Sequence, residues 1–398
     1  MQDKISRDLN RNKYFDSLHV LDKFQCCLKG DIMKIKKINV LIILMIVALI
    51  IGCSSQEFTS AKLYVQQKNL PKAEEFFLLA MEREPMNPEV PYLLARDVYG
   101  PQEKYGLTLE YLNKSLERGP LFEKEIAELK EYFWQKSYNE GLRYYTALQN
   151  QSAEDPEKAI ELAVRYLENA KEFKPVDERA FYQLARIAKN YMEDDEKSMA
   201  YLDEGLKRAE NASLIREYKA IQLVQKGERD EALSLLKEVM SMESDRKMEA
   251  SQLYARILLE DERYDEAEAT FKEIVENDPD NSDNYFNLGY LYVRMAGVAD
   301  DADNAEKAAE FFEKAKNQFE IVLAMNPDDL LVIEAVGDLY TELKDYMTAE
   351  YYYQQMVDKD PMNANYIKKL GRVIYLQGRH EEGQALWDQA KTLEALDE

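Results

Sequence analysis

Cysteine and histidine, on which most metal and covalent protein chemistry depends, are scarce in this chain of 398 residues. It contains 3 Cys and 2 His, and from residue 54 onward only His380 remains. Disulfides, redox CxxC pairs and thiolate or imidazole metal sites are therefore excluded from that region. No Gly-rich phosphate loop, GxSxG or HExxH motif occurs. The sequence thus predicts no cofactor, no metal and no catalytic site, and we expect the protein not to be an enzyme.

Glycine is also scarce, with 14 residues in the chain, and runs of β-branched residues are rare beyond the apolar stretch at residues 40–51. Both absences disfavour sheets and glycine-rich loops. Hydrophobic residues make up 46% of the chain, which is enough for a sizeable core. This composition favours an all-α fold.

Positive charge is in short supply after the first 52 residues. Residues 53–398 carry 43 Lys or Arg against 71 Asp or Glu, a net charge of −28. Such a chain repels phosphate backbones, so nucleic acid is excluded as a partner. It is also repelled by anionic lipid headgroups unless something covalent holds it at a membrane.

One apolar run stands out, at residues 40–51. It is too short to span a bilayer as a helix, because that takes about 20 residues. Its length is typical of the apolar region of an export signal, and the Lys-rich stretch at residues 34–37 supplies the positive charge that precedes such a region. We therefore interpret residues 33–52 as a signal peptide.

The run closes with Ile50-Ile51-Gly52-Cys53, which resembles the lipobox of bacterial lipoproteins. The resemblance implies cleavage before Cys53 and the attachment of fatty acyl chains, such as palmitate, to that residue. More than one acyl chain gives stable membrane anchoring. The alternative is a buried apolar helix that happens to end in Gly-Cys.

Residues 1–32 precede this signal and show no clear periodicity. We expect either that the start was assigned too early, with translation beginning at Met33, or that these residues form a long cytoplasmic extension. They are excluded from the fold prediction in both cases.

Internal repetition dominates the rest of the chain. Residues 330–363 read LLVIEAVGDLYTELKDYMTAEYYYQQMVDKDPMN, a unit of 34 residues. Small and aromatic residues and a closing proline fall where the tetratricopeptide repeat (TPR) pattern has them: Gly337, Tyr340, Tyr346, Ala349, Tyr353 and Pro361. The unit therefore resembles a TPR, which implies two antiparallel helices. Small residues let the two helices approach, and proline ends the second helix.

The pattern recurs from residue 54 to the end of the chain, and prolines keep its register. We predict a superhelical TPR solenoid of about nine repeats, with an irregular helical bundle as the alternative. Repeats 1–2 are placed in residues 53–122, repeats 3–5 in 123–247 and repeats 6–9 in 248–398.

Two repeats depart from the pattern. The third has a long first helix, from about Glu123 to Leu148, followed by a loop insertion. The seventh carries an acidic insertion near residues 296–310, which we expect to be a solvated loop leading into a lengthened second helix, because the calcium-loop spacing fails. The last helix turns polar toward residue 398, as a capping helix does.

In TPR proteins, the first helix of each repeat lines a concave groove. The resemblance places four cations and three aromatic residues on that face near the C-terminus: Arg256, Phe286, Tyr290, Arg294, Lys368, Arg372 and Tyr375. Aromatic anchors and arginines suit a segment of a protein partner. The alternative is that these cations pair with neighbouring carboxylates and only solvate the face.

The chain looks like a TPR lipoprotein, which implies a membrane-anchored scaffold that binds protein partners during assembly or secretion at the bacterial cell envelope. The alternative is an adaptor that recruits peptidoglycan-remodelling enzymes or proteases, with a regulatory subunit of an enzyme as a third hypothesis. Ser54, where an Asp suggests inner-membrane retention, favours the outer membrane facing the periplasm.

Overall fold

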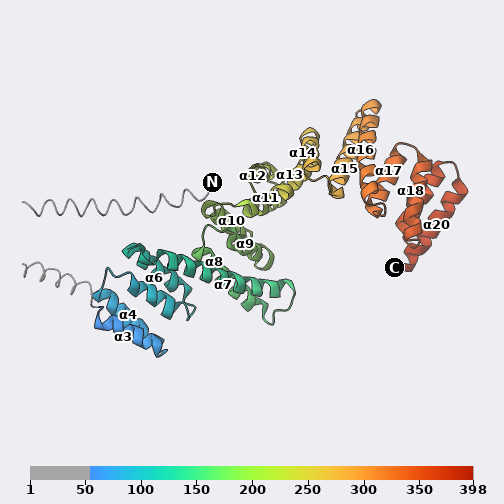
Figure 1. Cartoon of the computed structure of the whole chain (residues 1–398). Coiled ribbons are helices and arrows are strands. Elements are labelled where there is room, and N and C mark those ends of the chain that lie inside the picture. The colour runs from blue at the N-terminus through green and yellow to red at the C-terminus, as the bar shows by residue number, and fades with distance from the viewer. Residues whose placement is uncertain (1–53, 398) are drawn as a thin grey trace, which may run out of the picture. The chain divides into compact units, whose positions relative to one another are not determined.

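The computed structural model describes residues 54–397. These residues form helices and turns, with no β-strand among them, so the expected all-α fold is confirmed (Figure 1). No helix of the described part is long and apolar enough to cross a membrane. Residues 1–32, the signal peptide at 33–52 and the expected lipidation site Cys53 lie outside the described residues.

The chain divides into two compact units at Lys130. The described part of the first unit contains a short π-helix, η1, and a 3₁₀ turn, η2, among its α-helices. Its elements are α3 (Gln56–Gln66), α4 (Leu70–Arg83), α5 (Glu89–Leu93), η1 (Leu94–Tyr99), α6 (Tyr105–Arg118), η2 (Pro120–Phe122) and the start of α7 (Glu123–Gln149).

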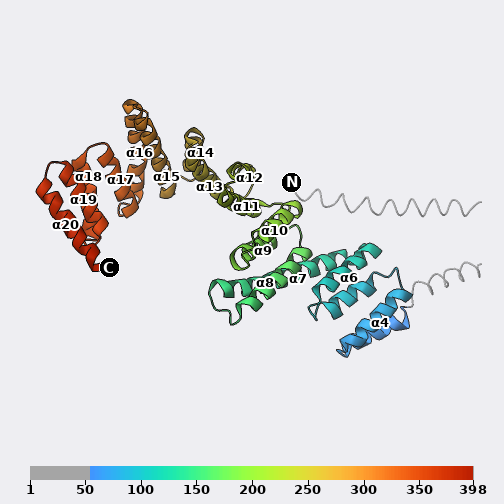
Figure 2. The ribbon, with the colours of Figure 1, turned by 180° about the vertical axis from the view of Figure 1, so that it is seen from behind.

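The second unit begins within α7 and is a continuous series of helices (Figures 1 and 2). They are α8 (Pro156–Phe173), α9 (Glu178–Tyr191), α10 (Asp195–Arg208), α11 (Ser213–Lys226), α12 (Arg229–Ser241), α13 (Lys247–Glu260), α14 (Tyr264–Asn277), α15 (Ser282–Asp301), α16 (Ala305–Met325), α17 (Leu330–Glu342), α18 (Tyr346–Lys359), α19 (Ala364–Leu376) and α20 (His380–Asp397).

Counted as helix A and helix B of successive repeats, with α5 and η1 together forming one helix A, the described elements make nine pairs. This agrees with the predicted number of repeats. The long first helix of the third repeat is also present, as α7, and a loop separates it from α8.

The structure differs from the sequence expectation at residues 296–310. They do not form a solvated loop, because α15 continues through Asp301 and α16 begins at Ala305. The segment is rich in alanine, the strongest helix former, and Ala296, Ala299 and Ala308 are buried. The insertion therefore lengthens both helices of the seventh repeat.

A left-handed residue follows helix A in all nine described pairs, although a longer loop then leads to α8 and the α9–α10 turn differs in that Asp194 N–H donates to the Ala188 carbonyl. One residue of each turn has a left-handed backbone, with φ between 52° and 87°, and only two of the nine are glycine. In the α17–α18 turn, for example, Lys344 N–H donates to the Thr341 carbonyl and Asp345 N–H to the Tyr340 carbonyl. This is the Schellman helix end. The nine residues are Lys68, Glu103, Gln151, Glu193, Gly227, Glu262, Asp303, Lys344 and Gly378.

Side-chain caps start many of the helices that follow. The Asp345 carboxylate accepts a hydrogen bond from Thr348 N–H at the start of α18, 3.2 Å away. At the B-to-A connections, a proline such as Pro361 precedes a capping residue such as Asn363, which accepts from Asn365 N–H at 3.1 Å. Proline ends one helix, and the Asn or Asp cap begins the next after a short turn.

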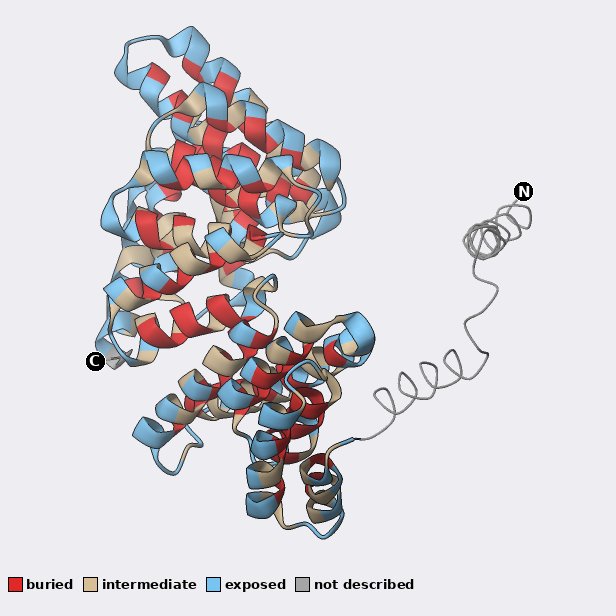
Figure 3. Ribbon diagram, turned by 90° about the vertical axis from the view of Figure 1, so that its left-hand side faces the viewer, coloured by how far each residue is buried: buried red, intermediate tan, exposed pale blue. Residues whose placement is uncertain are grey.

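Close approach of helices A and B forms the core. A methyl group added at Gly337 would lie 2.7 Å from the Tyr353 ring, and one at Gly289 would lie 2.7 Å from the Phe319 ring. The partner rings are buried, with Tyr353 2% and Phe319 1% exposed. Figure 3 shows buried residues on the facing sides of the helices, with exposed residues on their outer faces.

We predict that Glu193→Gly stabilises the protein by about 0.5–1 kcal/mol. A non-glycine residue at positive φ costs about 1–2 kcal/mol, part of which is offset by the greater freedom of glycine in the unfolded chain. Ala200→Gly, at an exposed position inside α10, is the matched control and should destabilise by about 1 kcal/mol. Urea unfolding measures both, and equal effects of the two substitutions would contradict this account of the turn.

Candidate functional site

The seven residues expected on the groove face lie on helix A of three repeats in the second unit. Arg256 is on α13 and Lys368 on α19. The others are Phe286, Tyr290 and Arg294 on α15, and Arg372 and Tyr375 on α19. Residues one turn apart on a helix share a face, so the members on α15 and on α19 each form a short stripe.

Three arginines of this set are exposed and have no carboxylate partner within the described part of the chain. They are Arg256, Arg294 and Arg372. Most other arginines of the same unit are paired; Arg246, for example, lies 2.6 Å from the Glu217 carboxylate. Arg165 and Arg186 are exceptions, and their guanidinium groups lie over the Tyr166 and Tyr182 rings instead. Three unpaired arginines on helix A faces of a strongly acidic chain are therefore available to a carboxylate of another molecule.

The other four residues behave differently. Phe286 is partly buried, with its ring 5.6 Å from that of Phe319, and so belongs to the core. Lys368 pairs with Glu394, and the Tyr375 ring packs 4.3 Å from His380. Tyr290 is 45% exposed. The reading in which cations pair with nearby carboxylates thus holds for Lys368 but not for the three arginines.

A pocket of about 540 Å³ connects α15, α17 and α19. Its lining includes Val293 and Gly297 from α15, Asp338 from α17, and Lys369 and Arg372 from α19. Both signs of charge line it, so it suits a polar segment. Arg372 is the one member of the predicted set that lines it.

A second pocket, of about 440 Å³, lies between α19 and α20. Sequence reasoning did not find it, because only helix A positions were considered, whereas half of this lining belongs to helix B. The spacing of Gln384, Trp387 and Lys391 along α20 could have revealed the shared face. The lining residues are Lys368, Lys369, Arg372, Gln384, Trp387 and Lys391.

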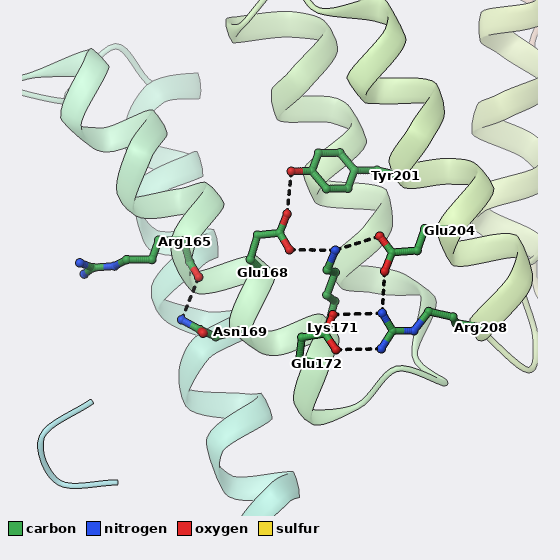
Figure 4. Close-up of polar contacts among 8 residues, drawn as sticks. All are labelled: Arg165, Glu168, Asn169, Lys171, Glu172, Tyr201, Glu204 and Arg208. Carbon is green, nitrogen blue, oxygen red and sulfur yellow. Dashed lines mark hydrogen bonds and ion pairs between the residues drawn. The ribbon is translucent and has the colours of Figure 1, made fainter. Parts of the chain in front are cut away.

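A cluster of charged side chains joins α8 and α10 (Figure 4). The Lys171 ammonium lies 2.8 Å from both the Glu168 and the Glu204 carboxylates. The Tyr201 hydroxyl donates to Glu168 at 2.7 Å, and Arg208 binds Glu204 at 2.5 Å. Several charged groups lie close together here, as they do in many catalytic sites. Whether they could transfer protons depends on their protonation states.

Burial lowers the pKa of Lys171, but the hydrogen bonds to Glu168 and Glu204 outweigh it and leave the pKa raised. Burial raises the pKa of Glu204, but the hydrogen bonds from Lys171 and Arg208 lower it by more, so the net shift is downward. Both groups are thus held in their charged forms at neutral pH. Such groups suit a structural ion-pair network better than proton transfer, which needs a pKa near the operating pH.

No group of three or more His, Cys, Asp or Glu side chains among residues 54–397 is placed to hold a metal ion.

Helix pairs joined by one recurring turn, with small residues packed against aromatic rings, define this protein as an all-α repeat solenoid. TPR family models match residues 223–288, 270–307 and 304–364, so the repeats in this part of the chain are of the tetratricopeptide type. This supports a protein-interaction scaffold as the general class of function.

Several solved structures are similar to the chain. A tetratricopeptide repeat protein from Parabacteroides merdae is 17% identical, with a TM-score of 0.42 over 65% of this chain and 93% of its own. MamA is 15% identical, with a TM-score of 0.38 over 45% of this chain and 95% of its own. TTC0263, a TPR protein of Thermus thermophilus, is 22% identical, with a TM-score of 0.34 over 45% of this chain and 89% of its own. No curated protein matches the sequence.

We predict that Lys171→Met destabilises the protein by about 1–3 kcal/mol at pH 7. Lys171 is buried, but both carboxylates remain about one-third exposed, so the loss is smaller than for a fully buried pair. Lys124→Met, which removes an exposed ion pair with Glu128, should cost less than about 0.5 kcal/mol.

The difference between wild type and Lys171→Met should shrink in acid. The pKa of Glu204 is lower in the folded chain than its ordinary value of 4.5, so its contribution is present above that value and is lost as the pH falls through the folded pKa. Urea midpoints at pH 7 and at about pH 3.5 measure this. An unchanged difference would contradict the ion-pair account.

Proposed function

We propose that this chain is a lipid-anchored scaffold of the bacterial cell envelope, without catalytic activity, which binds a protein partner along the helix A face of α13 to α19. The observation that carries the proposal is the set of unpaired arginines on that face, Arg256, Arg294 and Arg372. In a chain of net charge −24, most arginines of the second unit bind a carboxylate of the chain itself, so three that do not, on helix A of three repeats, are available to carboxylates of another molecule.

The exposed ring of Tyr290 lies one turn from Arg294 on α15. Aromatic residues and arginine contribute most of the binding energy at many protein interfaces. We therefore place the centre of the binding face at Tyr290 and Arg294, with the pocket between α15 and α19 beside it. A partner segment with carboxylates and an apolar side chain fits this combination.

The anchor proposal rests on Cys53 and the apolar signal before it. The first described helix, α3, begins at Gln56, and the Ser55 hydroxyl caps it by accepting from Phe58 N–H. Only two residues, Ser54 and Ser55, thus separate the first helix from acyl chains on Cys53, which favours a solenoid held close to the membrane. Ser54 after Cys53 favours the outer membrane, facing the periplasm.

We expect Arg256→Glu combined with Arg294→Glu to weaken partner capture severalfold without lowering the melting temperature, because both side chains are exposed and neither binds a carboxylate of the described chain. Photo-crosslinking in living cells from a benzoylphenylalanine at position 290, followed by mass spectrometry, measures capture. The control is Arg165→Glu, an exposed arginine on helix B of the third repeat. Capture that is equal in all variants would place the binding surface elsewhere, and a crosslinked hydrolase would favour the adaptor function instead.

Cys53→Ser should release the protein from the membrane fraction, because the acyl chains contribute about 0.8 kcal/mol for each buried CH₂ group and the rest of the chain is strongly acidic. Metabolic labelling with an alkyne fatty acid measures acylation, and sucrose-gradient fractionation of the envelope then shows which membrane holds the protein. If the Cys53→Ser variant still fractionates with membranes, the proposal that acyl chains on Cys53 anchor the protein is wrong.

A further inference from the structure

The contact between α17 and α19, which we call a joint, shows which positions of two successive A helices meet. In the eighth repeat, which starts at Leu330, Glu334 and Asp338 occupy positions 5 and 9. They hold the Lys369 ammonium of the next A helix at 2.9 and 2.7 Å. Lys369 is at position 6 of the ninth repeat, which starts at Ala364. Positions 5 and 9 of one helix A thus clamp position 6 of the next.

The same correspondence appears at an uncharged joint. In the fourth repeat, which starts at Glu178, Tyr182 is at position 5, and in the fifth, which starts at Ser213, Tyr218 is at position 6. Their rings meet edge to face with centroids 5.3 Å apart. At both joints position 5 of one A helix thus faces position 6 of the next, and at the α17–α19 joint position 9 does so as well.

In α19 these two positions are Lys368 and Arg372, so the charges are the reverse of those on α17. They line the pocket of about 440 Å³ between α19 and α20, together with Trp387 and Lys391. Lys368 pairs with Glu394, whereas Arg372 and Lys391 have no carboxylate partner among residues 54–397. No element follows α20 in the described chain, so no described helix A takes the place next to α19.

The Trp387 side chain gives this pocket an apolar wall. Its ring packs 5.2 Å from that of Tyr375, and its indole N–H donates to the Lys368 carbonyl at 3.3 Å. The ring is thus fixed beside the cations before any ligand binds, which lowers the cost of binding. A ligand that combines a carboxylate with an apolar face is complementary to this arrangement.

We infer that the pocket between α19 and α20 is a docking site for an acidic amphipathic helix of a protein partner. The helix lies against α19 as α19 lies against α17, and a carboxylate at the place equivalent to Lys369 is held by Arg372, with Lys368 and Lys391 beside it. This inference rests on the proposed scaffold function and names the chemistry of one partner segment.

A second copy of this chain fits the site less well. In a head-to-tail stack of copies, α3 would occupy the place next to α19. Counting from Ser54, position 6 of the first repeat is Thr59, which carries no carboxylate. The charge complementarity therefore favours a different protein.

The test uses a hydrocarbon-stapled, fluorescein-labelled peptide with the sequence of residues 364–376, in which Lys369 is replaced by Glu. A second peptide keeps the lysine. With the full chain in detergent, fluorescence anisotropy should show the Glu peptide binding about tenfold more tightly than the Lys peptide, as expected for one charge-assisted hydrogen bond. Arg372→Glu should reverse this preference. Lys207→Glu, an exposed lysine on α10, is the matched control and should keep it.

Equal binding of the two peptides, or a preference unchanged by Arg372→Glu, would overturn the inference. Equally tight binding of an unstapled Glu peptide with a central proline would show an extended ligand instead of a helix. Sedimentation that reveals dimers of the full chain, lost in Arg372→Glu, would identify a second copy as the occupant. In each of these cases, crosslinking of a partner from position 290 would still test the proposed groove function separately.

Discussion

Every helix of this protein depends on the close approach of helices A and B within a pair. Gly337 and Gly289 leave no room for a methyl group, because the rings of Tyr353 and Phe319 already occupy the space. One pair cannot bury both of its apolar faces alone, so each pair needs a neighbour, and the repeats stabilise each other in series. Left-handed residues at the ends of the A helices suit the same constraint, because most of these turns are short and return helix B to this distance.

The acidic character of the chain has two structural sources. Asp side chains cap helices such as α10 and α18, and carboxylates on neighbouring helices bind lysine and arginine. The Lys171 network between α8 and α10 and the Lys369 joint between α17 and α19 follow the same principle, with one cation held by two carboxylates. Against this pattern, the exposed arginines without a carboxylate on α13, α15 and α19 are the basis of the proposed binding face.

The binding proposals follow from how the repeats are joined. Helix A faces carry Arg256, Arg294 and Arg372 along the second unit, and Arg372 lines both pockets that α19 contributes to. The groove and the docking site on α19 are therefore neighbouring surfaces of one repeat. A partner that places a helix beside α19 and continues toward α15 would use both, with Tyr290 and Trp387 as its aromatic contacts.

Much of the fold follows from the sequence alone, because the 34-residue period, the prolines and the small residues are local features that act within one helix pair. They determined the all-α class, the nine pairs and the long α7. Only the tertiary structure showed that α15 continues to Asp301 and that the loop shrinks to residues 302–304, because buried alanines on α15 and α16 stabilise helix in a segment whose acidic composition favoured a loop. It also decided which cations are paired. Lys368 and Arg372 are one turn apart on the same helix, yet Glu394 of α20 reaches only the first, and such distances between helices are not encoded in local sequence.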